Sequence, residues 1–397
     1  MLEKLHKLHE VIDRFFDALG LRDDPEVQRR PEVLHWRGRW RADCDAVFEA
    51  FTQQVGEQPQ LAVSRLPTGT IAEILAIMKF ELVYHKDKLT DGHAKLLRKT
   101  FSRVLQASDV HVPKISAFFI PSMEVEFGDD CAVVGVAKGC EIKRGVYDRE
   151  TRLIAQYLSA DDQHARKLFW AATEIWHGFE HPNLAKMVGE SLVEAKPLVV
   201  WEDVDAQGDF IHYFGVNENQ KRLWRMFLEA GRGLNYIHQQ GKAHGSLKCS
   251  HILVSKHGTP KICHFELSKG SNVGAFDRWK GPEYNLGTGL DPSAAGDIYA
   301  FGLCIIEART GIIPYDTDCD DTVKRQLEEG NCYPRPEVMR DDEWNVVKRF
   351  VVHNPNERAT MAQGIEMMEE LAKKEALEEE HIDHENGKAL PYQNDTN

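Results

Sequence analysis

The stretch from His244 to His251 gathers residue types that could do chemistry. The residues around its glycine predict a tight turn after a long helical pattern, and the apolar run that follows predicts a short strand. Within the stretch lie the hydroxyl of Ser246, the ammonium of Lys248 and the imidazole of His251. A second imidazole, His264, follows the next strand-like run. Two imidazoles brought together could bind a soft metal such as zinc, but we favour two polar replacements in a cleft that binds no metal.

The order of these residues resembles the catalytic loop of a protein kinase, H-R-D-L-K-x-x-N-I-L-V. In that family the Asp is the catalytic base and the Asn binds a metal ion. Here Ser246 stands at the base position and His251 at the metal position, while Lys248 is kept and is expected to form an ion pair or surface contact. His264 stands where D-F-G supplies its metal-binding Asp. Because Mg²⁺ prefers hard oxygen ligands, the resemblance implies that magnesium is not bound.

The preceding strands resemble the small lobe of the same family, with its phosphate-binding groups replaced. Aligning Ile142 with the Val of G-x-G-x-x-G-x-V places Gly135, Ala137 and Cys140 at the three glycine positions. Backbone amides must approach phosphates closely there, so two side chains would push the loop away. The lysine of V-A-I-K falls on Gln156, or on the tyrosine after it, and neither is a lysine.

The helix after that strand lacks the glutamate that pairs with the family's lysine. Counting back from the His-Pro-Asn motif puts Ala172 at this position. Trp201, just before the hinge, would narrow the adenine pocket or, equally, would only fill the core. The remaining positions of the degenerate nucleotide cleft are Ala155, Glu202, Val204 and Leu253.

Several structural landmarks of the family are kept. Glu283 and Arg358 resemble the ion pair of the A-P-E motif, and Asp297 resembles the residue that holds the catalytic loop by its backbone. The runs D-I-Y-A-F-G and R-W-K-G-P-E are most similar to the tyrosine-kinase-like group. Because these motifs follow the family order over residues 121–372, we predict an α+β, bilobal protein-kinase-like fold.

An all-α helical bundle is predicted ahead of that domain, in residues 1–120. Apolar residues recur at helical spacing in four segments, near 2–19, 36–51, 70–82 and 90–105. The third is predicted to open at a capping box from Thr70 to Glu73, and the fourth near Thr90. A bundle before such a domain resembles kinases of oomycetes and the mixed-lineage kinase-like pseudokinase of necroptosis. The charged residues 373–397 predict a helix extension that frays into a disordered tail.

Composition excludes several classes of function. The 397 residues carry a net charge of −14, which argues against a nucleic-acid partner. No apolar run is long enough to span a bilayer, and the N-terminus has no signal-peptide core. The cysteines are dispersed without a C-x-x-C pair. This pattern indicates free thiols in a reducing compartment, so we expect a cytoplasmic protein.

Three hypotheses follow from the resemblance. The first is a pseudokinase that is not an enzyme and acts as a signalling scaffold or allosteric partner. It would bind protein partners, which could include an active kinase, would require no cofactor, and could still bind ATP. The second is a nucleotide-binding kinase with unorthodox phosphotransfer to Ser or Thr. The third is a membrane-acting effector that uses the N-terminal bundle. The bundle could also join two copies of the chain.

Overall fold

The described part of the chain, in a computed structural model, comprises residues 52–53, 56–122, 125–127, 133–137, 140–147, 151–157, 173–191, 193, 197–204, 206–263, 277–286 and 291–387. They belong to two compact units. The first comprises residues 1–122 with 193–195, and the second comprises residues 123–192 with 196–397. The division near residue 122 lies close to the end predicted for the helical bundle.

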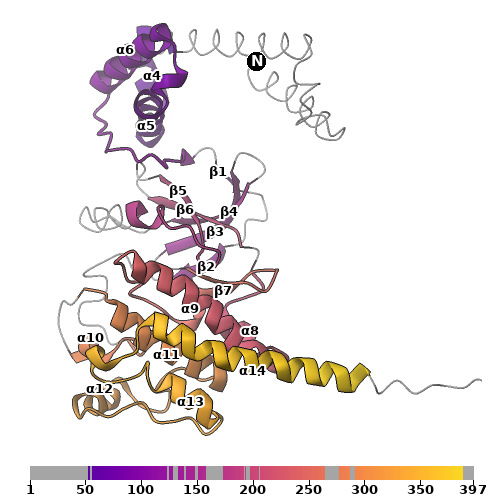
Figure 1. Cartoon of the computed structure of the whole chain (residues 1–397). Helices are drawn as coiled ribbons and strands as arrows, with labels where there is room; N and C mark the ends of the chain where they lie inside the picture. The colour runs from indigo at the N-terminus through magenta and orange to yellow at the C-terminus, as the bar shows by residue number, and fades with distance from the viewer. Residues whose placement is uncertain are drawn as a thin grey trace, which may run out of the picture. The chain divides into compact units, whose positions relative to one another are not determined.

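The first unit is helical in its described part, drawn in indigo and purple in Figure 1. Its helices are α4 (Pro59–Arg65), α5 (Thr68–Tyr84) and α6 (Asp91–Ala107). The third and fourth predicted segments correspond to α5 and α6, whereas α4 was not predicted. The first two predicted segments, 2–19 and 36–51, lie outside the described residues.

The helix starts in this unit match the sequence only in part. The predicted capping box is wrong, because α5 begins ahead of Thr70 and its start has no side-chain cap. The buried Glu73 instead accepts the backbone N–H of Ser122, a contact between segments far apart in sequence. In α6 the Thr90 hydroxyl accepts the N–H of His93 at 3.2 Å, as an N-cap should.

The second unit begins with an antiparallel sheet in the order β1-β3-β4-β6-β5, with β2 paired to β3. Its strands are β1 (Val125–Glu126), β2 (Val133–Ala137), β3 (Cys140–Tyr147), β4 (Thr151–Tyr157), β5 (Met187–Ser191) and β6 (Leu198–Glu202). In β4, Leu153 and Ala155 are fully buried, while Ile154 between them and Gln156 after them are more exposed. This alternation places one face of the sheet on a core.

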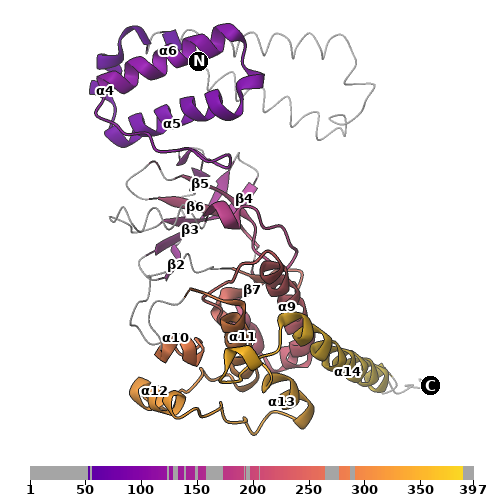
Figure 2. The same ribbon diagram turned by 60° about the vertical axis from the view of Figure 1, so that its left-hand side comes forward.

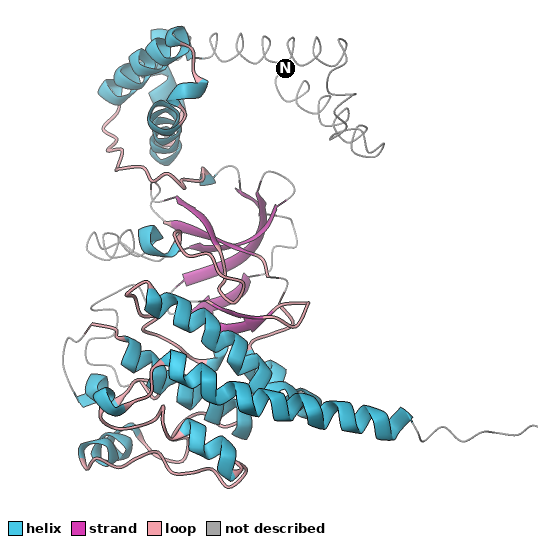
Figure 3. Cartoon of the chain, viewed as in Figure 1, coloured by secondary structure: helices cyan, strands magenta, loops and turns pink. Residues whose placement is uncertain are grey.

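The rest of the second unit is mainly helical, and Figure 3 shows the strands gathered apart from these helices. Its elements are α8 (Phe210–Phe214), α9 (Leu223–Gln239), the hairpin of β7 (Ile252–Val254) and β8 (Pro260–Ile262), α10 (Pro282–Leu286), α11 (Ala294–Thr310), α12 (Asp320–Glu328), α13 (Asp341–Val347) and α14 (Met361–Gly387). A sheet lobe followed by a helical lobe confirms the predicted α+β bilobal fold.

The last helix corrects the predicted tail. α14 packs along α9, as Figures 1 and 2 show, and continues to Gly387, so the segment from 373 is helical that far. Glu375 is buried, and its two oxygens accept the N–H groups of Trp224 and Arg225, each at 3.0 Å. The first amides of a helix have no partner within it. Glu375 therefore caps α9 from a neighbouring helix.

None of the described helices combines the length and the apolar content that a bilayer crossing requires.

Candidate functional site

The catalytic-loop segment is held by Asp297, in the first turn of α11. The Asp297 carboxylate accepts the backbone N–H of His244 at 2.7 Å and that of Gly245 at 2.8 Å. Gly245 has φ of 80°, a left-handed conformation that favours glycine. Both the carboxylate and His244 are buried. The predicted role of Asp297 is confirmed: it fixes the turn of the loop by its backbone.

His244 is fixed as a neutral imidazole by its neighbours. Its Nε2 lies 3.0 Å from the carbonyl oxygen of Cys263, and its Nδ1 accepts the N–H of Ser246 at 3.2 Å. A carbonyl only accepts hydrogen bonds, so Nε2 carries the proton and Nδ1 the lone pair. His244 thus joins the start of the loop to the residue that follows β8.

The two replaced positions of the loop are bonded to each other. The Nδ1 atom of His251 lies 2.6 Å from the carbonyl oxygen of Ser246, so Nδ1–H donates to that oxygen. An imidazole in this place does not supply the oxygen ligand that magnesium prefers. The residues present therefore do not fit a magnesium ion as the family binds it. His264 lies outside the described residues, so the structure tests neither the favoured metal-free cleft nor the alternative of a zinc ion shared with His251.

Lys248 forms the ion pair that was expected of it, with a partner that the sequence analysis missed. Its Nζ lies 3.1 Å from Oδ2 of Asp277 and 4.5 Å from the ring centroid of Trp279. The Asp277 side chain is only 9% exposed, and its Oδ1 accepts the backbone N–H of Trp279 at 3.1 Å. A carboxylate thus lies beside the catalytic loop, although the residue that supplies it does not stand at the family's base position. The sequence signal that could have pointed to Asp277 is its position directly before the R-W-K-G-P-E run.

The positions of the phosphate-binding loop lie on two paired strands. In the register of β2 and β3, Gly135 faces Ile142 and Ala137 faces Cys140. The four positions that the alignment assigns to the glycine-rich loop therefore lie opposite one another on β2 and β3. The side chains of β2 and of Cys140 lie outside the described part of the structure.

Gln156, at the lysine position, contacts Trp201, at the position before the hinge. The indole Nε1–H of Trp201 donates to the amide oxygen of Gln156 at 3.2 Å, across β4 and β6. Trp201 therefore does more than fill apolar space, because its indole N–H binds the side chain that stands at the lysine position. Ala172 lies outside the described residues.

The remaining cleft positions lie around the hinge. Ala155 is fully buried and faces Val200, while Val204 and Leu253 are half-buried. The Glu202 carboxylate forms an ion pair with Lys261 of β8 at 2.7 Å. This pair ties the hinge end of the sheet to the hairpin that follows the catalytic loop.

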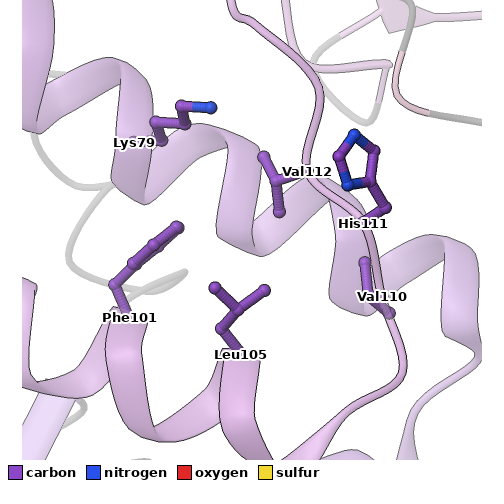
Figure 4. Close-up of a pocket in the computed structure, with 6 residues that line it drawn as sticks. All are labelled: Lys79, Phe101, Leu105, Val110, His111 and Val112. Atoms are coloured by element: carbon purple, nitrogen blue, oxygen red, sulfur yellow. The ribbon is translucent and has the colours of Figure 1, made fainter.

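The first unit contains a separate cavity of about 510 Å³, shown in Figure 4. Its walls come from α5, α6 and the segment after α6, and its lining residues are Lys79, Phe101, Leu105, Val110, His111 and Val112. The walls are mainly apolar. The polar side chains in the lining are Lys79, whose ammonium donates to the carbonyl of Pro113 at 2.8 Å, and His111.

A sheet lobe, a hinge, and a loop held by an aspartate of the following helix define a protein of the protein kinase class. The model of the family "Protein tyrosine and serine/threonine kinase" matches residues 132–368, more than half of the chain. The chain belongs to this family.

Three relatives are similar over this region. Tyrosine-protein kinase Fer of Mus musculus is 21% identical over 262 residues, which cover 62% of this chain and 31% of Fer. The transforming protein Fps of Avian sarcoma virus (strain PRCII) is 24% identical, with 48% and 38% covered. The probable serine/threonine-protein kinase kinX of Dictyostelium discoideum is 28% identical, with 42% and 16% covered. The chain thus spans about a third of the length of its Fer relatives.

These comparisons correct one expectation. From the replaced motif positions we expected a chain that is not an enzyme. The matching family is defined by kinases, and the relatives are named as tyrosine and serine/threonine kinases. The expectation failed because it considered only groups at the family's own positions, and Asp277 beside Lys248 shows that a carboxylate can reach the loop from elsewhere. The narrower resemblance to oomycete kinases stays a prediction.

Proposed function

We propose that this chain is a signalling protein of the kinase family whose kinase-fold domain acts through protein–protein contacts, as a scaffold or as an allosteric partner of another kinase. The observation that carries the proposal is the retention of the buried framework. Asp297 holds the loop and Arg358 binds Glu283 at 2.7 Å, although Ser246 and His251 replace the family's reacting groups. Such a role requires no cofactor and is compatible with phosphotransfer by the same domain.

The retained framework orders the surface that a partner would contact. Arg358 and Glu283 fix the segment at α10, which follows the catalytic loop in the fold. On the same lobe, directly after α11, Ile312 and Ile313 are 53% and 42% exposed. Contiguous exposed apolar patches mark protein interaction sites, and this pair would form part of such a patch. We assign this pair to the partner-binding surface.

Assembly in cells tests this proposal. The full chain, tagged and expressed at its natural level, should elute in a complex larger than the chain itself, with a kinase as a stoichiometric component. Ile312→Glu combined with Ile313→Glu should dissociate the complex, while Lys248→Ala should leave it intact. The control is Leu377→Glu, which places the same charge at another exposed apolar position, on α14. A monomeric chain, or a complex that survives the double substitution, would refute the proposal.

A second candidate is phosphotransfer with an unorthodox set of residues, favoured by the carboxylate of Asp277 at the loop. A carboxylate within reach of a substrate hydroxyl can act as a general base. The purified chain should then transfer labelled phosphate from ATP to protein Ser or Thr, and Asp277→Asn should reduce the rate by about 10²–10⁴-fold. Ser246→Ala should have little effect. Absence of transfer with magnesium, manganese or no divalent ion would remove this candidate.

A further inference from the structure

Two thiols and a carboxylate meet in the core of the large lobe, directly behind the catalytic loop. Cys249 begins the 3-10 turn Cys249–His251, and Cys304 and Glu307 lie one turn apart on α11. Their Sγ and carboxylate oxygen atoms all lie within 4.8 Å of one another, and all three side chains are buried. The family alignment gives these positions no role in phosphotransfer.

The carboxylate of Glu307 is only half satisfied. Its Oε2 accepts the indole N–H of Trp279 at 2.9 Å. Its Oε1 is buried and receives no nitrogen or oxygen donor within the described part of the chain, while the neighbouring Cys249 thiol donates to the carbonyl oxygen of Cys304 at 3.1 Å. A buried carboxylate oxygen without a partner is costly. A proton or a cation is needed to neutralise it.

We propose that Cys249, Cys304 and Glu307 bind a zinc ion. Two thiolates and a carboxylate are a ligand set that zinc accepts, and thiolates select soft ions over magnesium or calcium. In a tetrahedral site with Zn–S of about 2.3 Å and Zn–O of about 2.0 Å, the ligand atoms lie roughly 3.5–3.8 Å apart. The three atoms lie within 4.8 Å of one another, so a contraction of about an ångström completes the site.

The charges and protons balance in this arrangement. Binding forms two Zn–S bonds and one Zn–O bond, and the thiol protons and any carboxyl proton pass to solvent. The site then carries one net negative charge, which the neighbouring Lys248 ammonium offsets only in part because it already forms an ion pair with Asp277. A fourth ligand would be needed to complete the tetrahedron. Trp279 orients the carboxylate through Oε2, as an outer-shell donor does at many metal sites.

The ion would pin the catalytic loop to α11 at a second point. Asp297, near the start of that helix, holds the turn at His244 and Gly245. Zinc would hold the same loop at Cys249, from farther along the helix. Because the three ligands are buried, the ion would be acquired during folding and would serve structure.

The test is the metal content of the full chain, purified without an affinity metal and dialysed against chelator-treated buffer. Mass spectrometry of the elements should find about one zinc per chain. Cobalt substituted for zinc should show cobalt–thiolate charge-transfer absorption. Cys249→Ser and Cys304→Ser should each lose the zinc, and Trp279→Phe should weaken its retention about tenfold against a competing chelator.

Matched controls separate a site from chance uptake. Cys263→Ala removes a buried thiol outside the cluster, and Cys319→Ser removes an exposed one, and both should keep the zinc. If the ligand variants do not fold, zinc should still raise the refolding yield of the unmodified chain from denaturant several-fold over chelator alone. A purified chain without zinc, a Cys249–Cys304 disulfide, or zinc content unchanged in both ligand variants would overturn the proposal.

Discussion

Arg358 and Glu283 form a two-pronged ion pair across 75 positions of sequence, with Nη1–Oε1 and Nη2–Oε2 both at 2.7 Å. The Arg358 side chain is only 1% exposed. Its remaining donors reach the carbonyl oxygens of Val352, Ala295 and His353. All three guanidinium nitrogens therefore donate hydrogen bonds, and Arg358 joins α10, α11 and the segment before α14.

Loss of this guanidinium should be strongly destabilising. Arg358→Ala leaves the Glu283 carboxylate without its partner and should lower the free energy of unfolding by about 3–5 kcal/mol. Urea denaturation followed by fluorescence measures the change. Lys373→Ala, which breaks the exposed ion pair with Glu370, should cause no measurable change. A stability loss equal in both variants would contradict the structural role of Arg358.

The hold of Asp297 on the loop can be observed at single amides. Asp297→Ala should expose the N–H groups of His244 and Gly245 to hydrogen exchange and should cost about 1–3 kcal/mol. Ser293→Ala is the control, because Ser293 caps the same helix by accepting the N–H of Gly296 at 3.1 Å. It should cost about 1 kcal/mol without deprotecting the loop amides. Unchanged protection in Asp297→Ala would show that the loop is held in another way.

The stability of the second unit should fall in mild acid, in part through His181. Burial, and then the charge of Lys261, lower the pKa of His181 below its ordinary value of 6.5. Its Nδ1 accepts the N–H of Asn183 at 3.1 Å, which only the neutral ring can do there. The unfolded state therefore binds more protons, so stability is fully present above pH 6.5 and is lost as pH falls through the folded pKa.

His181→Asn keeps an acceptor for the amide but cannot titrate. The decrease in urea midpoint between about pH 7 and pH 5 should be smaller in this variant than in the unmodified chain. The comparison is His257→Asn, at an exposed position in the turn between β7 and β8. An identical pH dependence in all three chains would exclude His181 as a contributor.

The continuation of α14 predicts a sharp difference between two truncations. A chain that ends after Ala372 loses Glu375, and with it the cap on Trp224 and Arg225 of α9. It should be destabilised by about 2 kcal/mol or more, since one buried and one half-buried amide lose their acceptor. A chain that ends after Gly387 should have an unchanged melting temperature. Equal stability of the two chains would favour the disordered tail that the sequence predicted.

The sequence predicted the fold because its landmarks are local and ordered. Asp297, Glu283 and Arg358 lie within short motifs, and the structure confirms the contacts that those motifs implied. Periodicity also located α5 and α6, while the short α4 was missed because seven residues provide too little pattern.

Contacts between distant segments could not be predicted in the same way. Glu73 has the spacing of a capping box, yet its carboxylate serves Ser122. Glu375 lies in a highly charged stretch that resembles a tail, yet it is buried against α9. Asp277 reaches Lys248 because the chain returns to the catalytic loop just before α10. In each case the partner is chosen by tertiary packing, which periodicity and spacing do not encode.

The most direct measurement is recovery of the kinase-containing complex when the chain is returned to cells that lack it. Wild type and Lys248→Ala should restore it equally, while the folded Ile312→Glu, Ile313→Glu double variant should fail, because the proposed function depends on contacts. Rescue by the double variant together with failure of Lys248→Ala would contradict the proposed function.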